Sequence, residues 1–273
     1  MPRRTPAFRS SAARSGSARA PAAFAAWAGA LVGLAVALLL FAPARWLTRS
    51  VEDASAGHLL LSAPRGTVWN GSAQLVLAGG SGSTDDAALP DRIEWRLRPA
   101  WAGVRLQLQA ACCTPQPLVV SATFGWSGLR IRVEDGGSTW PAALLSGLGT
   151  PFNTLQPEGT LALRTDKLAL HIADGRLSMA GRTDIDIQNM ASSVSQLRPL
   201  GSYRLSLVGG DVPNLQLSTL DGPLRLSGEG RWVGNRLRFT GEARALPERE
   251  AALSVLLNLL GRRDGARSVI TLG

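Results

Sequence analysis

The chain has few of the side chains that most enzymes and metalloproteins use for chemistry. Its 273 residues include two Cys, two His, one Tyr and a single lysine, Lys167. Two Cys and two His cannot supply a zinc-finger array, an iron–sulfur centre or a disulfide-stapled scaffold. Charged residues are also scarce, at 18%, while 45% of the residues are hydrophobic, so a disordered acidic or basic chain is excluded. The 30 Gly and 16 Pro instead suit many short strands joined by tight turns.

The formal charge of +9 is concentrated at the N-terminus. The first 49 residues contain seven Arg and no Asp or Glu, which leaves 22 basic and 20 acidic residues from position 50 onward. The body of the protein is therefore nearly neutral. A nucleic-acid-binding protein would show a basic patch, and we expect no nucleic-acid partner.

The N-terminal region predicts a membrane anchor. Residues 1–21 are rich in Arg, Ser, Ala and Pro and are expected to form a disordered cytoplasmic tail. Residues 22–42 carry no charge, and a helix of this length spans about 30 Å, the thickness of the hydrocarbon core. Five Arg before the run and two after it favour a cytoplasmic N-terminus and an exported body. The alternative is a cleaved signal peptide, because Ala42-Pro43-Ala44 fits a small-residue cleavage site.

After an expected linker at 43–57, the chain from 58 to 273 is predicted to be mainly β. Apolar and polar residues alternate with period two, for example over 93–98, 104–109 and 129–134. Such segments recur about every 8–12 residues and are separated by turn residues, which is typical of antiparallel folds. Each strand would have one apolar and one polar face, so the fold class is a curved, open antiparallel sheet or a sandwich.

Two segments depart from this pattern toward helix. Residues 140–148 and 247–260 both have Pro near the start and Gly at the end, and the second carries Leu at helical spacing. We expect its apolar face to pack against the sheet; the alternative is a helix that binds a partner or lies on a membrane. Residues 81–91 are expected to form a surface loop, and Asp174-Gly175 and Gly234-Asn235 to form hairpin turns.

No catalytic, metal-binding or cofactor-binding constellation is predicted. His58 and His171 have no second His or Cys at metal-ligand spacing, and two isolated His make a Ser/His/Asp triad improbable. Asp184 and Asp186 share one face of a strand and resemble paired carboxylates. Polar residues on a solvated face explain these two Asp more simply.

Cys112 and Cys113 are adjacent. In an exported domain such a pair is expected to be oxidised, and we predict a vicinal disulfide that rigidifies one loop. A free reactive pair and a pairing between chains are the alternatives. Two adjacent thiols alone offer poor geometry for a metal.

Four segments carry a family resemblance. They are Ala63–Ala73 (APRGTVWNGSA), Leu144–Leu161 (LLSGLGTPFNTLQPEGTL), Ser192–Leu205 (SSVSQLRPLGSYRL) and the ending Leu256–Gly273. In this order, behind a single N-terminal anchor and with the Cys112-Cys113 pair, they resemble the type II secretion system protein N family, also called general secretion pathway protein N. The resemblance spans about residues 20–273.

The resemblance implies a single-pass protein of the bacterial inner membrane with a periplasmic β domain. It implies a non-enzymatic accessory role in type II protein secretion, through contacts with inner-membrane platform proteins or the secretin. No binding residues carry over from the family. An alternative function is lipid binding or transfer, in which the apolar face of a curved sheet would hold acyl chains. An apolar face covered by the helices at 140–148 and 247–260 would be a core, whereas an open one would suit lipid.

The motif positions are the candidate contact residues. They are Gly66, Trp69, Gly149, Asn153, Pro157, Gly159, Pro199, Gly201 and Tyr203. We interpret them first as turn and packing determinants, and second as part of a partner surface. Among them Trp69 is the strongest candidate for a contact, since an aromatic ring beside Asn-Gly can be presented at a strand edge.

Overall fold

The structure is a computed structural model. It describes residues 19–80, 82–126, 128–173, 176–210, 212–233 and 236–273, leaving aside the side chains of 19–25 and 176. Most of the predicted tail, residues 1–18, and the turns predicted at Asp174-Gly175 and Gly234-Asn235 lie outside the described residues. The chain divides into two compact units, Met1–Ala42 and Pro43–Gly273.

The first unit contains one helix, α1 (Arg19–Leu40). Ala and Leu predominate in it, and both residues have high helix propensity. Its large apolar side chains are exposed, with Trp27 at 71% and Leu31 at 62%. Within the described part of the chain, no helix combines the length and the apolar character needed to cross a membrane.

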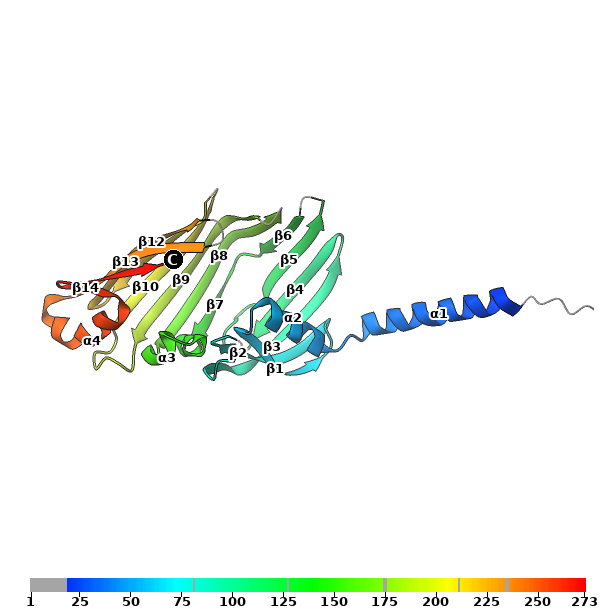
Figure 1. The fold of residues 1–273 in the computed structure, drawn as a ribbon, viewed down its shortest axis with the longest axis horizontal. Coiled ribbons are helices and arrows are strands. Elements are labelled where there is room, and N and C mark those ends of the chain that lie inside the picture. Colours follow the sequence, from blue (N-terminus) through cyan, green and yellow to red (C-terminus); the bar gives the residue numbers. More distant parts are fainter. Residues whose placement is uncertain (1–18, 81, 127, 174–175, 211, 234–235) are drawn as a thin grey trace, which may run out of the picture. The chain divides into compact units, whose positions relative to one another are not determined.

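The second unit is built on one antiparallel sheet (Figure 1). Apart from β7, its strands lie side by side in the order β1 to β6, β8 to β13, β15 and β14, and β7 pairs with β8 beside β6. The strands are β1 (Leu59–Gly66), β2 (Asn70–Ala78), β3 (Asp86–Ala100), β4 (Gly103–Ala110), β5 (Leu118–Gly125), β6 (Gly128–Val133), β7 (Gly136–Pro141), β8 (Glu158–Ala173), β9 (Arg176–Ala191), β10 (Gly201–Gly210), β11 (Asn214–Asp221), β12 (Leu224–Val233), β13 (Arg236–Ala245), β14 (Arg262–Asp264) and β15 (Arg267–Leu272).

The mainly β, open antiparallel architecture predicted from the alternation is confirmed. The sheet is a single one, so the sandwich alternative is wrong. The two segments used to predict the alternation pair directly, with Trp95 opposite Leu108 and Leu97 opposite Leu106. Their apolar residues therefore share one face, and the intervening Arg and Gln residues share the other.

The helices of this unit are more numerous than the two predicted. They are α2 (Ala44–Ala54), η1 (Ala142–Leu148), α3 (Phe152–Leu155), η2 (Pro247–Arg249) and α4 (Glu250–Leu260). The second predicted helix is confirmed as η2 and α4. The first is a 3₁₀ helix that begins at Ala142, because Trp140 and Pro141 end strand β7. Helix α2 occupies the stretch expected as a linker.

The expected loop at 81–91 is partly wrong. Strand β3 begins at Asp86, so only the first part of this stretch connects strands. Leu89 is fully buried against Ala110, Cys113 and Leu144. That tertiary contact, made with residues far away in the sequence, overrides the turn-like local composition.

Three clusters of buried side chains connect the helices to the sheet. Helix α4 packs Leu253, Leu256 and Leu257 against Tyr203 and other residues of the C-terminal strands. Helix α2 packs Ala44 and Leu47 against strands β2 to β4, and η1 packs Leu144 against strands β2 and β3. All three helices lie on the apolar face, so that face is core wherever a helix covers it.

Candidate functional site: an open apolar trough

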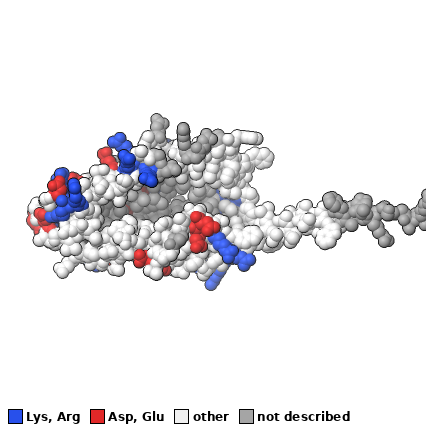
Figure 2. All heavy atoms as spheres, in the orientation of Figure 1, with Lys and Arg blue, Asp and Glu red and all other residues white. Residues whose placement is uncertain are grey.

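Between the helices the apolar face of the sheet is uncovered. Apolar residues line it in three cross-strand ladders, and we call these ladders together the apolar trough. The first joins Leu97, Leu106 and Val120, the second joins Ile131 and Leu170, and the third joins Leu163, Ile185, Leu205 and Leu217. All of these residues are only half-buried. Figure 2 shows this face hollowed, with Lys, Arg, Asp and Glu gathered around the hollow rather than within it.

The predicted helices do not close the trough. Helix α2, which was not predicted, covers Trp95, Leu108 and the trough residue Leu106 at one end, and the trough residue Leu217 packs against the cluster under α4 at the other end. Leu144 of η1 belongs to the cluster against which Ile93, in the middle of β3, packs. The middle strands keep an exposed apolar strip, which a closed globular core would not have.

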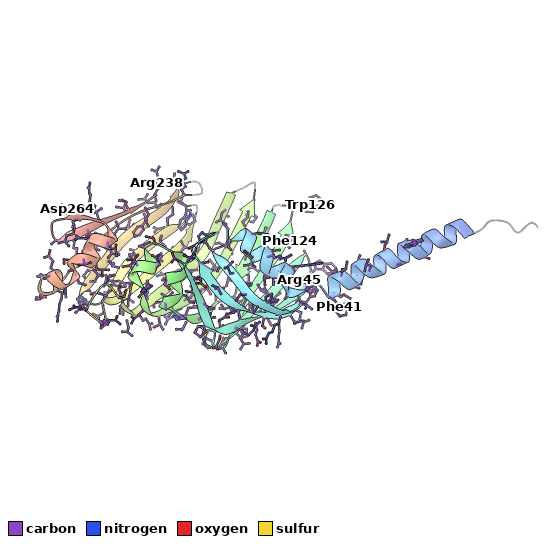
Figure 3. The ribbon with its side chains drawn as sticks, turned by 60° about the horizontal axis from the view of Figure 1, so that its bottom comes forward. Phe41, Arg45, Phe124, Trp126, Arg238 and Asp264 are labelled. Atoms are coloured by element: carbon purple, nitrogen blue, oxygen red, sulfur yellow. A yellow bond between two sulfur atoms is a disulfide. The ribbon has the colours of Figure 1, made fainter. Side chains whose placement is uncertain are left out.

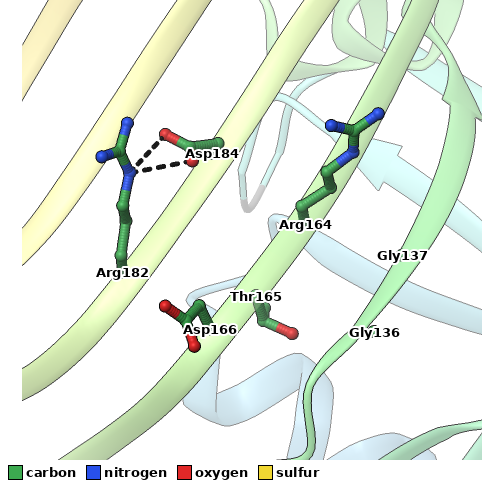
Figure 4. A pocket seen from close by; sticks show the side chains of 7 residues that line it. All are labelled: Gly136, Gly137, Arg164, Thr165, Asp166, Arg182 and Asp184. Carbon is green, nitrogen blue, oxygen red and sulfur yellow. Dashed lines mark hydrogen bonds and ion pairs between the residues drawn. The ribbon is translucent and has the colours of Figure 1, made fainter.

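The opposite face of the sheet is charged. A hollow of about 390 Å³ on this face is lined by Arg164, Asp166, Arg182 and Asp184, together with Gly136, Gly137 and Thr165 (Figure 4). Arg182 donates to both carboxylate oxygens of Asp184, at 3.0 and 2.8 Å. Ser206 Oγ donates to the same carboxylate at 2.5 Å.

Asp186, the second carboxylate of the pair, is buried and held by arginine. Arg204 donates to its two oxygens at 2.6 and 2.9 Å. The hydrogen bond from Arg204 holds the pKa of Asp186 below its usual range. Both Asp184 and Asp186 are therefore engaged in structural ion pairs rather than poised for proton transfer.

Replacing Asp186 with Asn is expected to lower the free energy of unfolding by about 2 kcal/mol, because the amide cannot form the charge-assisted pair. Since the folded-state pKa is depressed, the wild-type contribution is present above the unfolded pKa and lost as pH falls through the folded one. The difference between the two proteins should accordingly shrink in acid. Urea denaturation at neutral and acidic pH measures it.

The matched control is Glu158→Gln. Glu158 pairs with Arg198 at 2.6 Å, but both side chains are about half exposed. Solvent screens such a pair, so its loss should cost less than about 0.5 kcal/mol. Equal effects of the two substitutions would contradict a structural role for the buried pair.

The candidate motif residues lie in three places. Gly66 and Trp69 flank the β1–β2 turn, where the Trp69 carbonyl accepts from Leu97 N–H at 2.7 Å. Trp69 is half-buried, so the ring expected as the main contact is not fully presented. The motif glycines Gly66, Gly149, Gly159 and Gly201 all have positive φ.

The second and third groups of motif residues meet each other. Asn153 Nδ2 donates to Asp85 at 2.9 Å, and Pro157 is fully buried. Ser192 Oγ, from the third motif, donates to the Leu155 carbonyl of the second at 2.5 Å. Pro199 lies in the connection before β10, and Tyr203 is completely buried. These contacts join the loop before β8 to the loop before β10, and of the motif residues named here Pro199 remains exposed.

The cysteines and histidines form no centre. Cys112 and Cys113 are disulfide-bonded in the β4–β5 connection, and the Cys113 carbonyl accepts from Thr139 N–H at 2.8 Å. His58 Nδ1 lies 3.1 Å from the Ala78 carbonyl. Among the described residues, no group of three or more His, Cys, Asp or Glu could hold a metal.

The most exposed aromatic residues were not predicted as contacts. Trp101 is 99% exposed and Trp126 109%, both at hairpin tips. The sequence indicates this exposure only through composition, since both Trp residues have small neighbours. Ala100 and Ala102 flank Trp101, and Gly125 and Ser127 flank Trp126. A bulky aromatic residue in a turn makes few contacts within its own chain.

The described residues thus define an open antiparallel β protein, with an apolar trough on one face of its sheet and ion pairs on the other. The chain belongs to the type II secretion system protein N family, whose sequence model matches residues 58–270. It is thus an accessory component of type II protein secretion. No curated protein and no solved structure matches the chain.

Proposed function

We propose that this protein is a non-enzymatic, inner-membrane-anchored component of the type II secretion machinery that acts through protein–protein contacts in the periplasm. The observation that carries the proposal is the family match over residues 58–270. The partners would be inner-membrane platform proteins or the secretin. The scarcity of Cys, His and Lys is consistent with a scaffold.

The anchor and its orientation belong to this proposal. Residues 22–42 form an uncharged run that follows five Arg, and the positive-inside tendency favours a cytoplasmic N-terminus. The exposed apolar side chains of α1 support its burial in a membrane, because such a surface is unfavourable in water. The β domain from residue 58 would then lie in the periplasm.

Strand β1 supplies a physical route to partner binding. Among the residues that the structure describes, it pairs on one side only, with β2, and most of its residues are exposed. An unpaired edge of this kind accepts a strand from another protein through main-chain hydrogen bonds. The opposite edge, β14, is three residues long and carries Arg262 and Arg263, which protect it from strand addition.

A second candidate function is lipid binding in the apolar trough. The specific observation that favours it is the set of half-exposed ladders, since a strip of apolar side chains along a curved face suits acyl chains. In this case the occupant would lie across the middle strands, between α2 and α4.

One experiment separates the two functions. A photo-cross-linker replaces exposed Ser62 on β1, and the tagged full-length protein is extracted in mild detergent for mass spectrometry of proteins and lipids. We expect cross-links to secretion components from Ser62 and none from a cross-linker at Ala266, near the β14 edge. Stoichiometric phospholipid without those proteins would instead favour lipid binding.

Two variants locate any bound lipid. Ile131→Glu places a charge in the trough, whereas Arg132→Glu, at the next position of the same strand, changes the charged face. Lipid held in the trough should be lost from the first variant alone. Retention in both, or loss from both, would count against the trough as the site.

A further inference from the structure

The hairpin tips at one end of the sheet form an exposed aromatic edge. Trp101 lies in the β3–β4 turn, and Phe124 and Trp126 lie at the β5–β6 turn. The two tips are adjacent, because Gly103 pairs with Thr123 and Phe124 N–H donates to the Ala102 carbonyl at 2.9 Å. We call Trp101, Phe124 and Trp126 the aromatic rim. Figure 3 shows Phe124 and Trp126 at the ends of their strands.

The exposure of the rim is extreme. Trp101 and Trp126 are 99% and 109% exposed, and Phe124 is 61% exposed. They contribute almost nothing to the core of their own unit. Ile172, at 39%, extends the apolar edge to the next strand, where it pairs with Leu129. Contiguous exposed apolar side chains of this kind mark an interaction surface.

Positive charge accompanies the rim. Arg98 pairs with Arg105 across β3 and β4, and Arg130 lies opposite Thr123 on β6. Arg105 is paired with Glu134, but in the described part of the chain Arg98 and Arg130 form no ion pair. The segments 98–105 and 123–130 contain no Asp or Glu. The edge thus combines free cations with aromatic rings.

Exposed aromatic rings and charge together select the partner. The rim consists of two neighbouring hairpin tips with strongly exposed rings. Tryptophan prefers the headgroup level of a bilayer, where its ring is apolar on one side and wet on the other. Arginine near the surface is attracted to anionic headgroups. We propose that the aromatic rim docks on a bilayer surface that contains anionic phospholipid.

This contact is separate from the anchor and from the trough. It needs neither strand addition at β1 nor an occupant of the apolar trough. It would hold the β domain against a membrane through its hairpin tips. In the test, the anchor is therefore first inserted into one bilayer. Binding of the same molecule to a second bilayer is then measured.

Full-length protein is placed in phosphatidylcholine nanodiscs and mixed with separate vesicles, which are then floated on a density gradient. The vesicles contain phosphatidylcholine alone or with phosphatidylglycerol. We expect about tenfold more disc-borne protein to float with the anionic vesicles, and high salt to reduce that fraction. Trp101→Ser combined with Trp126→Ser should bring it to the level of protein-free discs.

Matched variants keep the result interpretable. Val255→Ser with Leu259→Ser removes two exposed apolar side chains from α4 and should leave flotation unchanged. Arg98→Gln with Arg130→Gln should reduce flotation on anionic vesicles. Thermal melting of each variant verifies folding, and the salt dependence of the wild type tests the charge contribution without any substitution.

The opposing outcomes are distinct. Equal flotation of the wild type and the rim variant, or no flotation of the wild type, would overturn the proposal. Cross-linking of Trp126 to a secretion protein in cells, with no vesicle binding, would assign the rim to a protein partner and also overturn it. Failure of the anchor would appear as protein that does not enter discs; that protein would be mixed with vesicles directly, with the same readouts.

Discussion

Replacing Tyr203 with alanine is expected to lower the free energy of unfolding by about 4 kcal/mol, the largest effect of any motif position. Tyr203 is completely buried in the cluster that joins α4 to the sheet. Its hydroxyl donates to the Leu224 carbonyl at 3.0 Å and lies 3.3 Å from the Leu200 carbonyl. Alanine would leave a cavity and remove the hydroxyl donor from the Leu224 carbonyl, whereas the Leu200 carbonyl still accepts from Leu224 N–H. Urea denaturation of the full-length protein measures the loss.

Tyr203→Phe separates the ring from the hydroxyl. Burial raises the pKa of the Tyr203 phenol well above its usual range, so the group stays a donor throughout the physiological pH range. Phenylalanine fills the same space and loses the hydrogen bond, which should cost about 1 kcal/mol. A Tyr203→Ala protein of unchanged stability that no longer bound its partners would show that Tyr203 is a contact residue instead.

Gly159→Ala is expected to destabilise the protein by about 3 kcal/mol. Gly159 has a φ of +122°, a conformation that side chains disfavour, and a Cβ there would lie 2.6 Å from the Gln188 carbonyl oxygen. The neighbouring backbone of β9 cannot move away without breaking its pairing with β8. Circular dichroism during thermal melting should show a lower midpoint.

Gly136→Ala is the matched control. Gly136 lies on β7, the neighbour of β8, and a Cβ there would meet its nearest atom, the Glu134 carbonyl oxygen, at 4.0 Å. We expect a change within about 0.5 kcal/mol. If both glycines tolerate alanine equally, the backbone at the α3–β8 junction is not under the strain that we infer.

Several features of the fold were predictable from local sequence. Alternation over 93–98 and 104–109 predicted strands with one apolar face, and the pairing of Leu97 with Leu106 confirms it. Leu at helical spacing after Pro247 predicted α4. Both signals depend on the period of side-chain direction along a backbone, which needs no knowledge of distant residues.

Other features depended on distant contacts. Helix α2 was not predicted, and it exists where Ala44 and Leu47 pack against Trp95 of β3. Asp186 looked like a solvated carboxylate, yet Arg204 on the neighbouring strand buries and neutralises it. In both cases the contact is made with a strand that is distant in the sequence. The local sequence pattern therefore could not predict it.

The candidate surfaces divide in the same way. Motif spacing pointed to Trp69 and Tyr203, of which the first is half-buried and the second is core. The exposed rings are Trp101 and Trp126, whose adjacency arises only when β4 pairs with β5. A residue's neighbours across a sheet are set by register, and register involves the whole array of strands.

The sequence by itself determined the strand faces, the helix at 250–260, the uncharged N-terminal run and the family motifs. Each of these features depends only on short-range periodicity or composition. Only the tertiary structure decided that the sheet is single and open, that its apolar face is partly uncovered, and that two tryptophans lie on neighbouring hairpin tips. Those properties depend on which strands are neighbours and on what covers each face, and both are long-range consequences of packing.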